Sequence, residues 1–201
     1  MTISSAARPT RSIGMFVAIV GPSGAGKDTI ITGLRPRLPA DRFFFPRRLI
    51  TRQADTTEDS QYLPEPAFFS SKIAGEFLIS WEANGLHYAI AREARAELEL
   101  GRHVLANLSR NAIPSLKLLL PRVLVVHVTA RRDVLEERLR LRGREVTEMQ
   151  LERLDRGLRL DAAVEADIRI ENNGPPEQAI IALLNVLTLL PPPASTLGAA
   201  P

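Results

Sequence analysis

The residues with the clearest chemical potential occupy positions 21–28, Gly-Pro-Ser-Gly-Ala-Gly-Lys-Asp. Their spacing satisfies the G-x-x-x-x-G-K part of a phosphate-binding loop, and an apolar strand pattern precedes it as this motif requires. Glycines let backbone N–H groups surround phosphate oxygens, and Lys27 adds a mobile positive charge for the outer phosphates. We therefore predict phosphate binding by nine consecutive residues: Gly21, Pro22, Ser23, Gly24, Ala25, Gly26, Lys27, Asp28 and Thr29.

Asp28 departs from the usual motif, which carries Ser or Thr at this position as a ligand for Mg²⁺. One interpretation is that its carboxylate only stabilises the first turn of a helix, by about 0.3–1 kcal/mol. The other is that it meets the metal, because Mg²⁺ prefers oxygen ligands. Asn107, at the end of a later predicted strand, is neutral where P-loop enzymes commonly carry an acid. We hypothesise that one negative charge has moved from position 107 to Asp28, and we assign both residues to a metal site.

A second group of candidate residues is rich in arginine. Arg138, Arg142 and Arg144 surround a glycine-containing break, and Arg153 follows on the next predicted helix. One interpretation is a solvated helix face, because nearby glutamates are available as i,i+4 partners. The other is a lid over about residues 138–153 that neutralises a transferred phosphoryl group, since the segment lies downstream of a phosphate-binding loop.

The composition restricts the class of protein. A chain of 201 residues with 45% hydrophobic and 24% charged content is expected to form one ordinary globular domain. The 26 basic residues outnumber the 23 acidic ones by only three, so the net charge gives no indication of a nucleic-acid partner. The absence of cysteine excludes disulfides and thiolate metal sites and favours the cytoplasm. We expect no membrane role, because the N-terminus lacks a signal-peptide pattern and no apolar stretch reaches the ~20 residues that span a bilayer.

The elements that must position these residues alternate between strand and helix. Apolar, β-branched segments at 15–20, 104–107, 123–129 and 167–170 predict strands, with helical spacing between them. This order is typical of an α/β fold with a parallel sheet covered on both faces. Helices are predicted to begin at Thr147 and over about 176–190, and the segment 52–67 is expected to be a loop-rich insertion. We predict one domain over 14–190 between disordered tails at 1–13 and 191–201.

The motif order over about residues 15–190 resembles the guanylate-kinase-like branch of the nucleoside monophosphate kinases. The matching runs are the phosphate-binding loop, Thr51-Arg52, Gly75-Glu76-Phe77-Leu78, Gly85 with Tyr88, Arg138-Leu139 with Arg142-Gly143, and Arg153-Leu154. The resemblance implies a P-loop NTPase fold with ATP on the loop and an acceptor-binding region over about 52–90. It also implies that Arg52 and Tyr88 hold an acceptor phosphate and that the lid carries Arg138, Arg142 and Arg153.

Three positions depart from that branch. Guanylate kinases read their base with a Glu, an Asp and a Ser or Thr where this chain has Ile79, Ser109 and Ile90. Because the acidic groups that would hydrogen-bond guanine are absent, a site built for that base is not expected.

The chain is more similar to the ribose 1,5-bisphosphate phosphokinase family of phosphonate utilisation. The shared runs are Gly26-Lys27-Asp28, Ile50-Thr51-Arg52, the segment from Ser80 and Trp81 to Tyr88, the segment from Asn107 to Arg110, and Arg142-Gly143-Arg144-Glu145. Two local differences are Ala89, where a glycine is expected, and residues 59–62, which do not reproduce the usual Glu-Asn-His run.

This resemblance implies ATP-dependent, Mg²⁺-dependent phosphorylation of the 1-phosphate of ribose 1,5-bisphosphate, which gives 5-phosphoribosyl 1-diphosphate and ADP. Because the acceptor oxygen is already ionised at neutral pH, the reaction needs no general base. The implied catalytic residues are Lys27, Arg138, Arg142 and Arg153. The implied acceptor-binding residues are Arg48, Arg52, Tyr88, Ser109, Arg110 and Arg144.

Two further classes of function stay open. One is a kinase for another small acceptor, such as a nucleoside monophosphate, in which Asp28 or Asp55 acts as a base. The other is a non-catalytic kinase-like domain that binds partners. The expected partners are the small-molecule substrates, and a homodimer is also left open. Trp81 is interpreted as a core residue or as a wall of the acceptor pocket.

Overall fold

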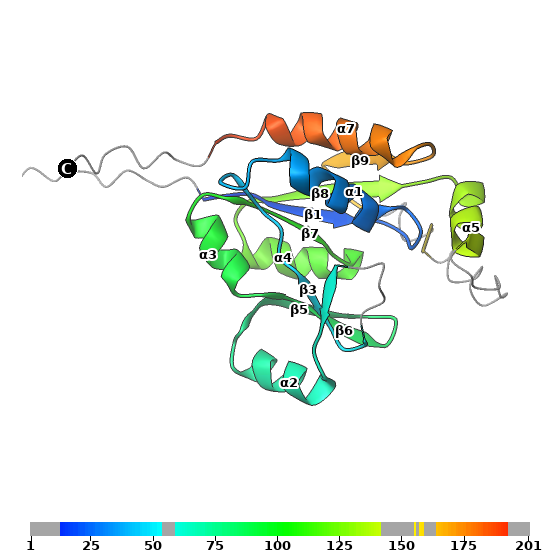
Figure 1. The fold of residues 1–201 in the computed structure, drawn as a ribbon. Helices are drawn as coiled ribbons and strands as arrows, with labels where there is room; N and C mark the ends of the chain where they lie inside the picture. Colours follow the sequence, from blue (N-terminus) through cyan, green and yellow to red (C-terminus); the bar gives the residue numbers. More distant parts are fainter. Residues whose placement is uncertain (1–12, 54–58, 142–154, 156, 159–163, 193–201) are drawn as a thin grey trace, which may run out of the picture.

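The computed structural model describes residues 13–53, 59–141, 155, 157–158 and 164–192. Its centre is a five-stranded parallel sheet in the order β2-β7-β1-β8-β9 (Figure 1). The strands are β1 (Phe16–Val20), β2 (Phe43–Phe44), β7 (His103–Asn107), β8 (Val123–Thr129) and β9 (Ile168–Glu171). Four of them match the predicted strands to within one residue, so the expected α/β class with a parallel sheet is confirmed.

Helices cover both faces of this sheet because its strands are apolar on both sides. In β1, Val17 and Ile19 contribute to one buried cluster with α1 (Lys27–Leu34) and α7 (Pro176–Thr188). Phe16 and Ala18 contribute to the opposite cluster with α3 (Glu93–Glu99) and α4 (Ile113–Leu119). Every β1 side chain is fully buried. The sheet therefore holds the loop after β1 on a rigid base.

A second sheet lies beside the first, in the order β4-β3-β6-β5 (Figure 1). Its strands are β3 (Arg48–Ile50), β4 (Ser60–Tyr62), β5 (Phe77–Ala83) and β6 (Leu86–Ala91), and α2 (Glu65–Ile73) connects β4 to β5. Strands β5 and β6 form a hairpin in which Asn84 and Gly85 both have positive φ, as a tight two-residue turn requires. This sheet corresponds to the predicted acceptor-binding region.

The interpretation of 52–67 as loop-rich is wrong in part. Residues 60–62 form β4, which pairs with β3 in parallel, and α2 begins at Glu65. A three-residue strand is too short to show a period of two, and its pairing joins segments that are not adjacent in the chain. Pro66, in the first turn of α2, is compatible with a helix start because the N–H that it lacks has no partner there in any helix.

The remaining elements are two short 3-10 helices, η1 (Arg35–Arg37) and η2 (Arg110–Ala112), and the helix α5 (Arg132–Leu141). Helix α7 ends at Thr188, two residues before the predicted boundary. The predicted helix from Thr147 lies mostly outside the described residues, as does most of the predicted lid. The predicted tails also lie outside them, except Ile13, Pro191 and Pro192, and the domain boundaries stay a prediction.

Candidate active site

The phosphate-binding loop connects β1 to α1 and depends on its glycines. Gly21 has φ +147°, and a Cβ added there would lie 2.0 Å from the Val128 carbonyl oxygen. Gly26 caps α1 in the left-handed conformation at φ +88°. A side chain at either position would therefore force the loop out of its present path. The predicted strand, loop and helix arrangement is confirmed.

Lys27, at the start of α1, points its side chain back over the loop. Its Nζ donates hydrogen bonds to the carbonyl oxygens of Gly21 at 2.9 Å and Pro22 at 2.8 Å. This conformation holds a positive charge beside the backbone that is predicted to surround phosphates. Ser23 and Thr29 are exposed at the tip of the loop and on α1, respectively.

Asp28 and Asn107 lie together although 79 positions separate them in the chain. The Asn107 Nδ2 donates to Asp28 Oδ1 at 2.9 Å. Parallel pairing of β1 with β7, which sets Ile19 opposite Asn107, brings the end of β7 to the start of α1. A carboxylate oxygen and an amide oxygen at one place are donors that Mg²⁺ accepts. The residues present therefore fit the predicted metal site, with the single negative charge on Asp28.

Asn172 supports the loop from the end of the edge strand β9. It is not among the site residues predicted from the sequence. It directly follows β9, is only 2% exposed, and donates from Nδ2 to the Ala25 carbonyl oxygen at 2.8 Å. The signal that could have found it is its place at the carboxyl end of a parallel strand, where α/β proteins bind ligands.

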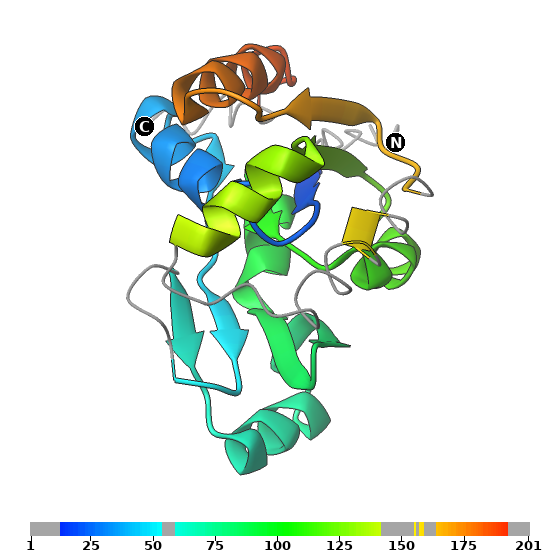
Figure 2. The ribbon, with the colours of Figure 1, turned by 90° about the vertical axis from the view of Figure 1, so that its right-hand side faces the viewer.

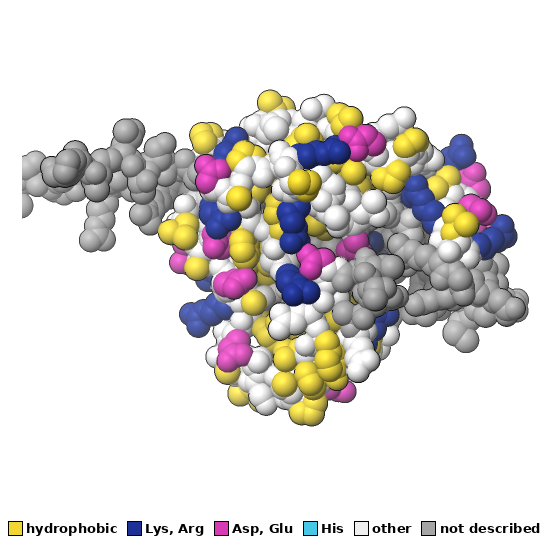
Figure 3. All heavy atoms as spheres, in the orientation of Figure 1, with side chains coloured by type: hydrophobic (Ala, Val, Ile, Leu, Met, Phe, Trp, Pro, Cys, Tyr) yellow, Lys and Arg dark blue, Asp and Glu magenta, His cyan; other side chains and the backbone are white. Residues whose placement is uncertain are grey.

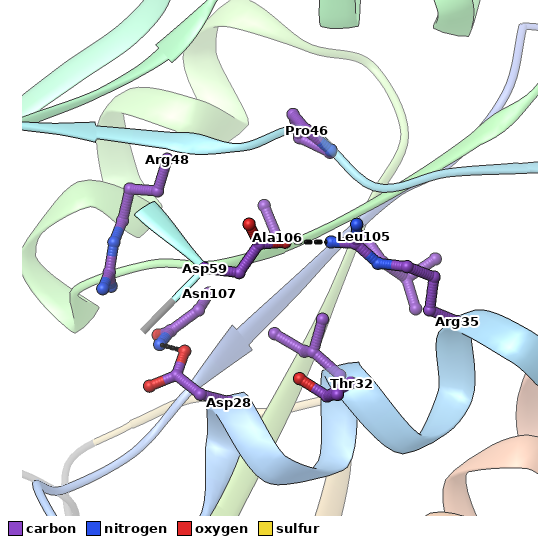
Figure 4. Close-up of a pocket in the computed structure, with 10 residues that line it drawn as sticks. Asp28, Thr32, Arg35, Pro46, Arg48, Asp59, Leu105, Ala106 and Asn107 are labelled. Carbon is purple, nitrogen blue, oxygen red and sulfur yellow. Dashed lines mark hydrogen bonds and ion pairs between the residues drawn. The ribbon is translucent and has the colours of Figure 1, made fainter. Parts of the chain in front are cut away.

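A pocket opens beside Asp28, between the two sheets (Figure 4). Both sheets contribute to it, with α1 as one wall. Asp59, just before β4, pairs with Arg35 and with Arg47, the latter at 3.0 Å. This carboxylate ties the second sheet to the end of α1. The full lining is Asp28, Ile31, Thr32, Arg35, Pro46, Arg48, Asp59, Leu105, Ala106 and Asn107.

The predicted acceptor-binding residues are brought only partly to this pocket. Arg48 lines it, and its guanidinium carbon lies 5.3 Å from the centre of the Tyr88 ring. Arg52 follows β3 and is half-buried, outside the lining. Ser109 precedes η2, and Arg110 Nη1 donates to the Gly157 carbonyl oxygen at 2.6 Å. The structure thus brings Arg48 together with Asp28 and Asn107, whereas Arg52, Tyr88, Ser109 and Arg110 are not among the residues that line this pocket.

Arg138 is the predicted lid residue that the structure describes. It lies on α5, which passes beside the phosphate-binding loop (Figure 2). Its Nη1 lies 3.4 Å from the Gly24 carbonyl oxygen and its Nη2 lies 3.4 Å from that of Gly174. Its guanidinium is therefore next to the predicted phosphates. Arg142, Arg144, Arg153 and Asp55 lie outside the described residues.

Sequence comparison identifies relatives over most of the chain, although no family model matches it. The chain is 43% identical to the ribose 1,5-bisphosphate phosphokinase PhnN of Chelativorans sp., covering 83% of this chain and 81% of that protein. It is 42% identical to the PhnN of Brucella melitensis, covering 80% and 85%. A bifunctional ribose 1,5-bisphosphokinase-thymidine phosphorylase of Cupriavidus pinatubonensis is 47% identical over 66% of this chain. The match spans only 22% of the length of that bifunctional relative.

Among solved structures, the guanylate kinase of Anaplasma phagocytophilum is similar, with a TM-score of 0.66 at 17% identity. The match covers 88% of this chain and 86% of that one, and it identifies the fold as that of a P-loop kinase. The sequence matches cover four fifths or more of both partners in the two PhnN comparisons. The chain therefore belongs to the PhnN family of ribose 1,5-bisphosphate phosphokinases.

Proposed function

We propose that this protein transfers the γ-phosphoryl group of ATP to the 1-phosphate of ribose 1,5-bisphosphate. The observation that carries the proposal is 38–43% identity to several proteins named ribose 1,5-bisphosphate phosphokinase over most of both chains. The site geometry supports it, because Asp28, Asn107 and Arg48 line one pocket, and Asp28 directly follows Lys27 of the phosphate-binding loop. A kinase active on small phosphates needs that combination of loop, carboxylate and guanidinium.

The reaction breaks the bond between the γ-phosphorus and the oxygen that bridges it to the β-phosphorus. A new bond forms from the γ-phosphorus to an oxygen of the 1-phosphate, and the bridging oxygen leaves with ADP. Because the attacking oxygen is already ionised, the protein supplies position and positive charge rather than a base. The other product is 5-phosphoribosyl 1-diphosphate.

The residues divide by role. Residues 21–29 hold the ATP phosphates, and Lys27 and Arg138, with Arg142 and Arg153, stabilise the transferred charge. Asp28 and Asn107 would hold Mg²⁺, which would neutralise part of the negative charge on the ATP phosphates. The acceptor phosphates and the sugar are assigned to Arg48, Arg52, Tyr88, Ser109, Arg110 and Arg144.

Guanylate kinase activity is the second candidate, because a guanylate kinase shares the fold. Two of the three base-reading positions argue against it. Ile79 is 4% exposed and Ile90 is fully buried, and both belong to the apolar cluster of the α3 and α4 side. Neither side chain offers a hydrogen bond, so guanine would lose its polar partners in that region.

We propose the cytoplasm as the location and the degradation of phosphonates as the context. Within the described part of the chain, no helix combines the length and apolar character needed to cross a membrane. On the face in Figure 3, basic and acidic side chains are interspersed, which suits small substrates better than a nucleic acid. A homodimer stays a prediction.

The deciding experiment is an ADP-release assay with ATP, Mg²⁺ and three acceptors in parallel. Ribose 1,5-bisphosphate is expected to give the highest kcat/KM, and ribose 5-phosphate and GMP to give little or none. Product identity is checked by converting 5-phosphoribosyl 1-diphosphate with a phosphoribosyltransferase. Preference for GMP would overturn the proposal, and no ADP release with any acceptor would favour the non-catalytic alternative.

A further inference from the structure

Three side chains form a row across one face of the second sheet. Trp81 on β5 is directly opposite Tyr88 on β6, and Ile50 on β3 is opposite Tyr88 on the other side. Arg48 precedes Ile50 by two residues, so it projects from the same face. Strand β6 lies between β3 and β5 in the sheet. The Tyr88 ring is therefore flanked by Trp81 from one neighbouring strand and by Arg48 from the other.

The geometry of the row restrains the Tyr88 ring. The Trp81 and Tyr88 rings are nearly parallel, with an interplanar angle of 10° and 5.6 Å between their centroids. The Arg48 guanidinium lies over the Tyr88 ring at 5.3 Å. The flat guanidinium of an arginine can stack on an aromatic face, which restrains both side chains. Stacking on both sides thus limits the rotamers of Tyr88 and of Arg48 together.

The row leads from the core to the pocket. Trp81 is half-buried against the apolar cluster that contains Ile79 and Ile90, whereas Arg48 lines the pocket with Asp28 and Asn107. In Figure 4 the Arg48 side chain extends toward those two residues. The Trp81 ring, packed against the core, therefore supports through Tyr88 a guanidinium beside the proposed reaction site.

We propose that Trp81 is a positioning residue for the acceptor, acting through Tyr88 and Arg48. The inference rests on the proposed function, in which Tyr88 and Arg48 hold an acceptor phosphate. Trp81 does not touch the acceptor. It restricts the side-chain conformations of Tyr88 and Arg48, so these residues lose less conformational entropy when the acceptor phosphate binds. The restriction therefore increases acceptor affinity rather than the rate of the chemical step.

Substitution at Trp81 tests the proposal through its effect on two separate KM values. Trp81→Leu removes the stacked ring, and Trp81→Phe keeps one. We expect Trp81→Leu to raise the acceptor KM by about 5- to 10-fold, as the loss of one stacked aromatic pair would. The KM for ATP and kcat are expected to stay within about twofold, and Trp81→Phe to restore most of the acceptor affinity.

Phe77→Leu is the matched control. Phe77 is also a half-buried aromatic residue of β5, but its ring contacts Phe68, with 4.9 Å between centroids. Both leucine variants lose an aromatic contact on the same strand, so a general loss of stability would affect them alike. An unchanged acceptor KM in folded Trp81→Leu, or an equal increase in Phe77→Leu, would overturn the proposal.

Fluorescence gives a second readout, because Trp81 is the sole tryptophan of the chain. Titration of the wild-type protein with ribose 1,5-bisphosphate, without ATP, is expected to change Trp81 emission to saturation. In Tyr88→Leu, the amplitude at saturation is expected to be at most half that of the wild type. If Trp81→Leu fails to fold, the wild-type titration decides alone. Trp81 emission that does not change at a saturating acceptor concentration would then overturn the proposal.

The assay separates this inference from the proposed function. Should GMP be phosphorylated and ribose 1,5-bisphosphate not, the proposed substrate is wrong. The same variants and titration with GMP then decide whether Trp81 positions the acceptor. Should ribose 1,5-bisphosphate be the substrate while Trp81→Leu leaves its KM unchanged, the proposed function stands and the positioning role is rejected.

Discussion

At the scale of single residues, the site is organised by how charge is placed around the phosphate-binding loop. Lys27 holds the one ammonium of the loop against two backbone carbonyls, and Asp28 holds a carboxylate one position later. Asn107 neutralises no charge but orients Asp28 by donating a hydrogen bond. Arg138 adds a guanidinium from α5. The direction of each of these groups is set by hydrogen bonds within the protein, as electrostatic stabilisation of a transferred phosphoryl group requires.

Lys27→Met should lower kcat by a factor of about 10²–10³ while the protein stays folded, because the charge that stabilises the transferred group is lost. The substitution also removes the two hydrogen bonds to Gly21 and Pro22, so unfolding by urea should accompany the steady-state kinetics. Lys72→Met, on the exposed surface of α2, is the control and should leave kcat unchanged. A kcat within tenfold of the wild type would contradict the assigned role of Lys27.

Asp28→Ser should weaken the Mg²⁺ dependence of turnover, raising the Mg²⁺ concentration for half-maximal rate by about 10- to 100-fold. Adding Asn107→Asp in the same chain returns the negative charge to the neighbouring strand end, so the double variant should recover part of the Mg²⁺ response. The measurement is the initial rate against Mg²⁺ concentration at saturating ATP. Full Mg²⁺-dependent turnover by Asp28→Ser alone would reject the proposed charge relocation.

At the scale of elements, the loop is held by strands that are remote from it in the chain. Asn172 follows β9, and its backbone N–H donates to the Thr129 carbonyl oxygen of β8 at 2.8 Å. Its side chain bonds the loop at Ala25, and a Cβ at Gly26 would lie 2.5 Å from its Nδ2. The residue that follows β9 is therefore packed closely against the phosphate-binding loop, and the loop cannot shift without moving Asn172.

Asn172→Ala should lower the free energy of unfolding by about 1–3 kcal/mol, because it leaves the Ala25 carbonyl without its buried side-chain donor. The KM for ATP should rise as the loop gains freedom. Urea unfolding and ATP titration measure the two effects. Asn185→Ala, at an exposed position of α7, is the matched control and should change neither quantity. Wild-type stability and ATP affinity in Asn172→Ala would show that the loop does not depend on this contact.

At the scale of the whole molecule, the two ends of the described domain are joined at His103. The Met15 N–H donates to His103 Nδ1 at 3.1 Å, so the ring proton must be on Nε2, which faces the Pro191 carbonyl oxygen at 2.9 Å. Arg42 Nη2 donates to the neighbouring Leu190 carbonyl at 2.7 Å. The first strand and the segment after the last helix are thus held by one buried imidazole, in its neutral form.

Stability should fall as the pH drops below about 6.5, the ordinary pKa of histidine. Burial lowers the pKa of folded His103, with Arg42 and Arg122 contributing in the same direction against the Pro191 hydrogen bond. The unfolded chain therefore binds a proton more readily than the folded protein, and stability is lost between the ordinary pKa and the lower folded one.

Urea unfolding at a series of pH values measures this loss, whose slope for one proton is at most about 1.4 kcal/mol per pH unit. His103→Gln has no titrating group at this position and should show a shallower decline than the wild type, even if its stability at neutral pH is lower. Parallel declines in the two proteins would mean that another group controls the acid sensitivity.

The sequence by itself determined the local features: the phosphate-binding loop, four strands of the parallel sheet, the final helix and the motifs of the PhnN family. These depend on spacing within short segments, where residue type and periodicity carry the information. The tertiary structure decided that Asn107 meets Asp28, that Asn172 supports Ala25, and that Tyr88 lies between Trp81 and Arg48. Each of these contacts follows from strand order and register between distant segments, which a pattern within one segment cannot specify.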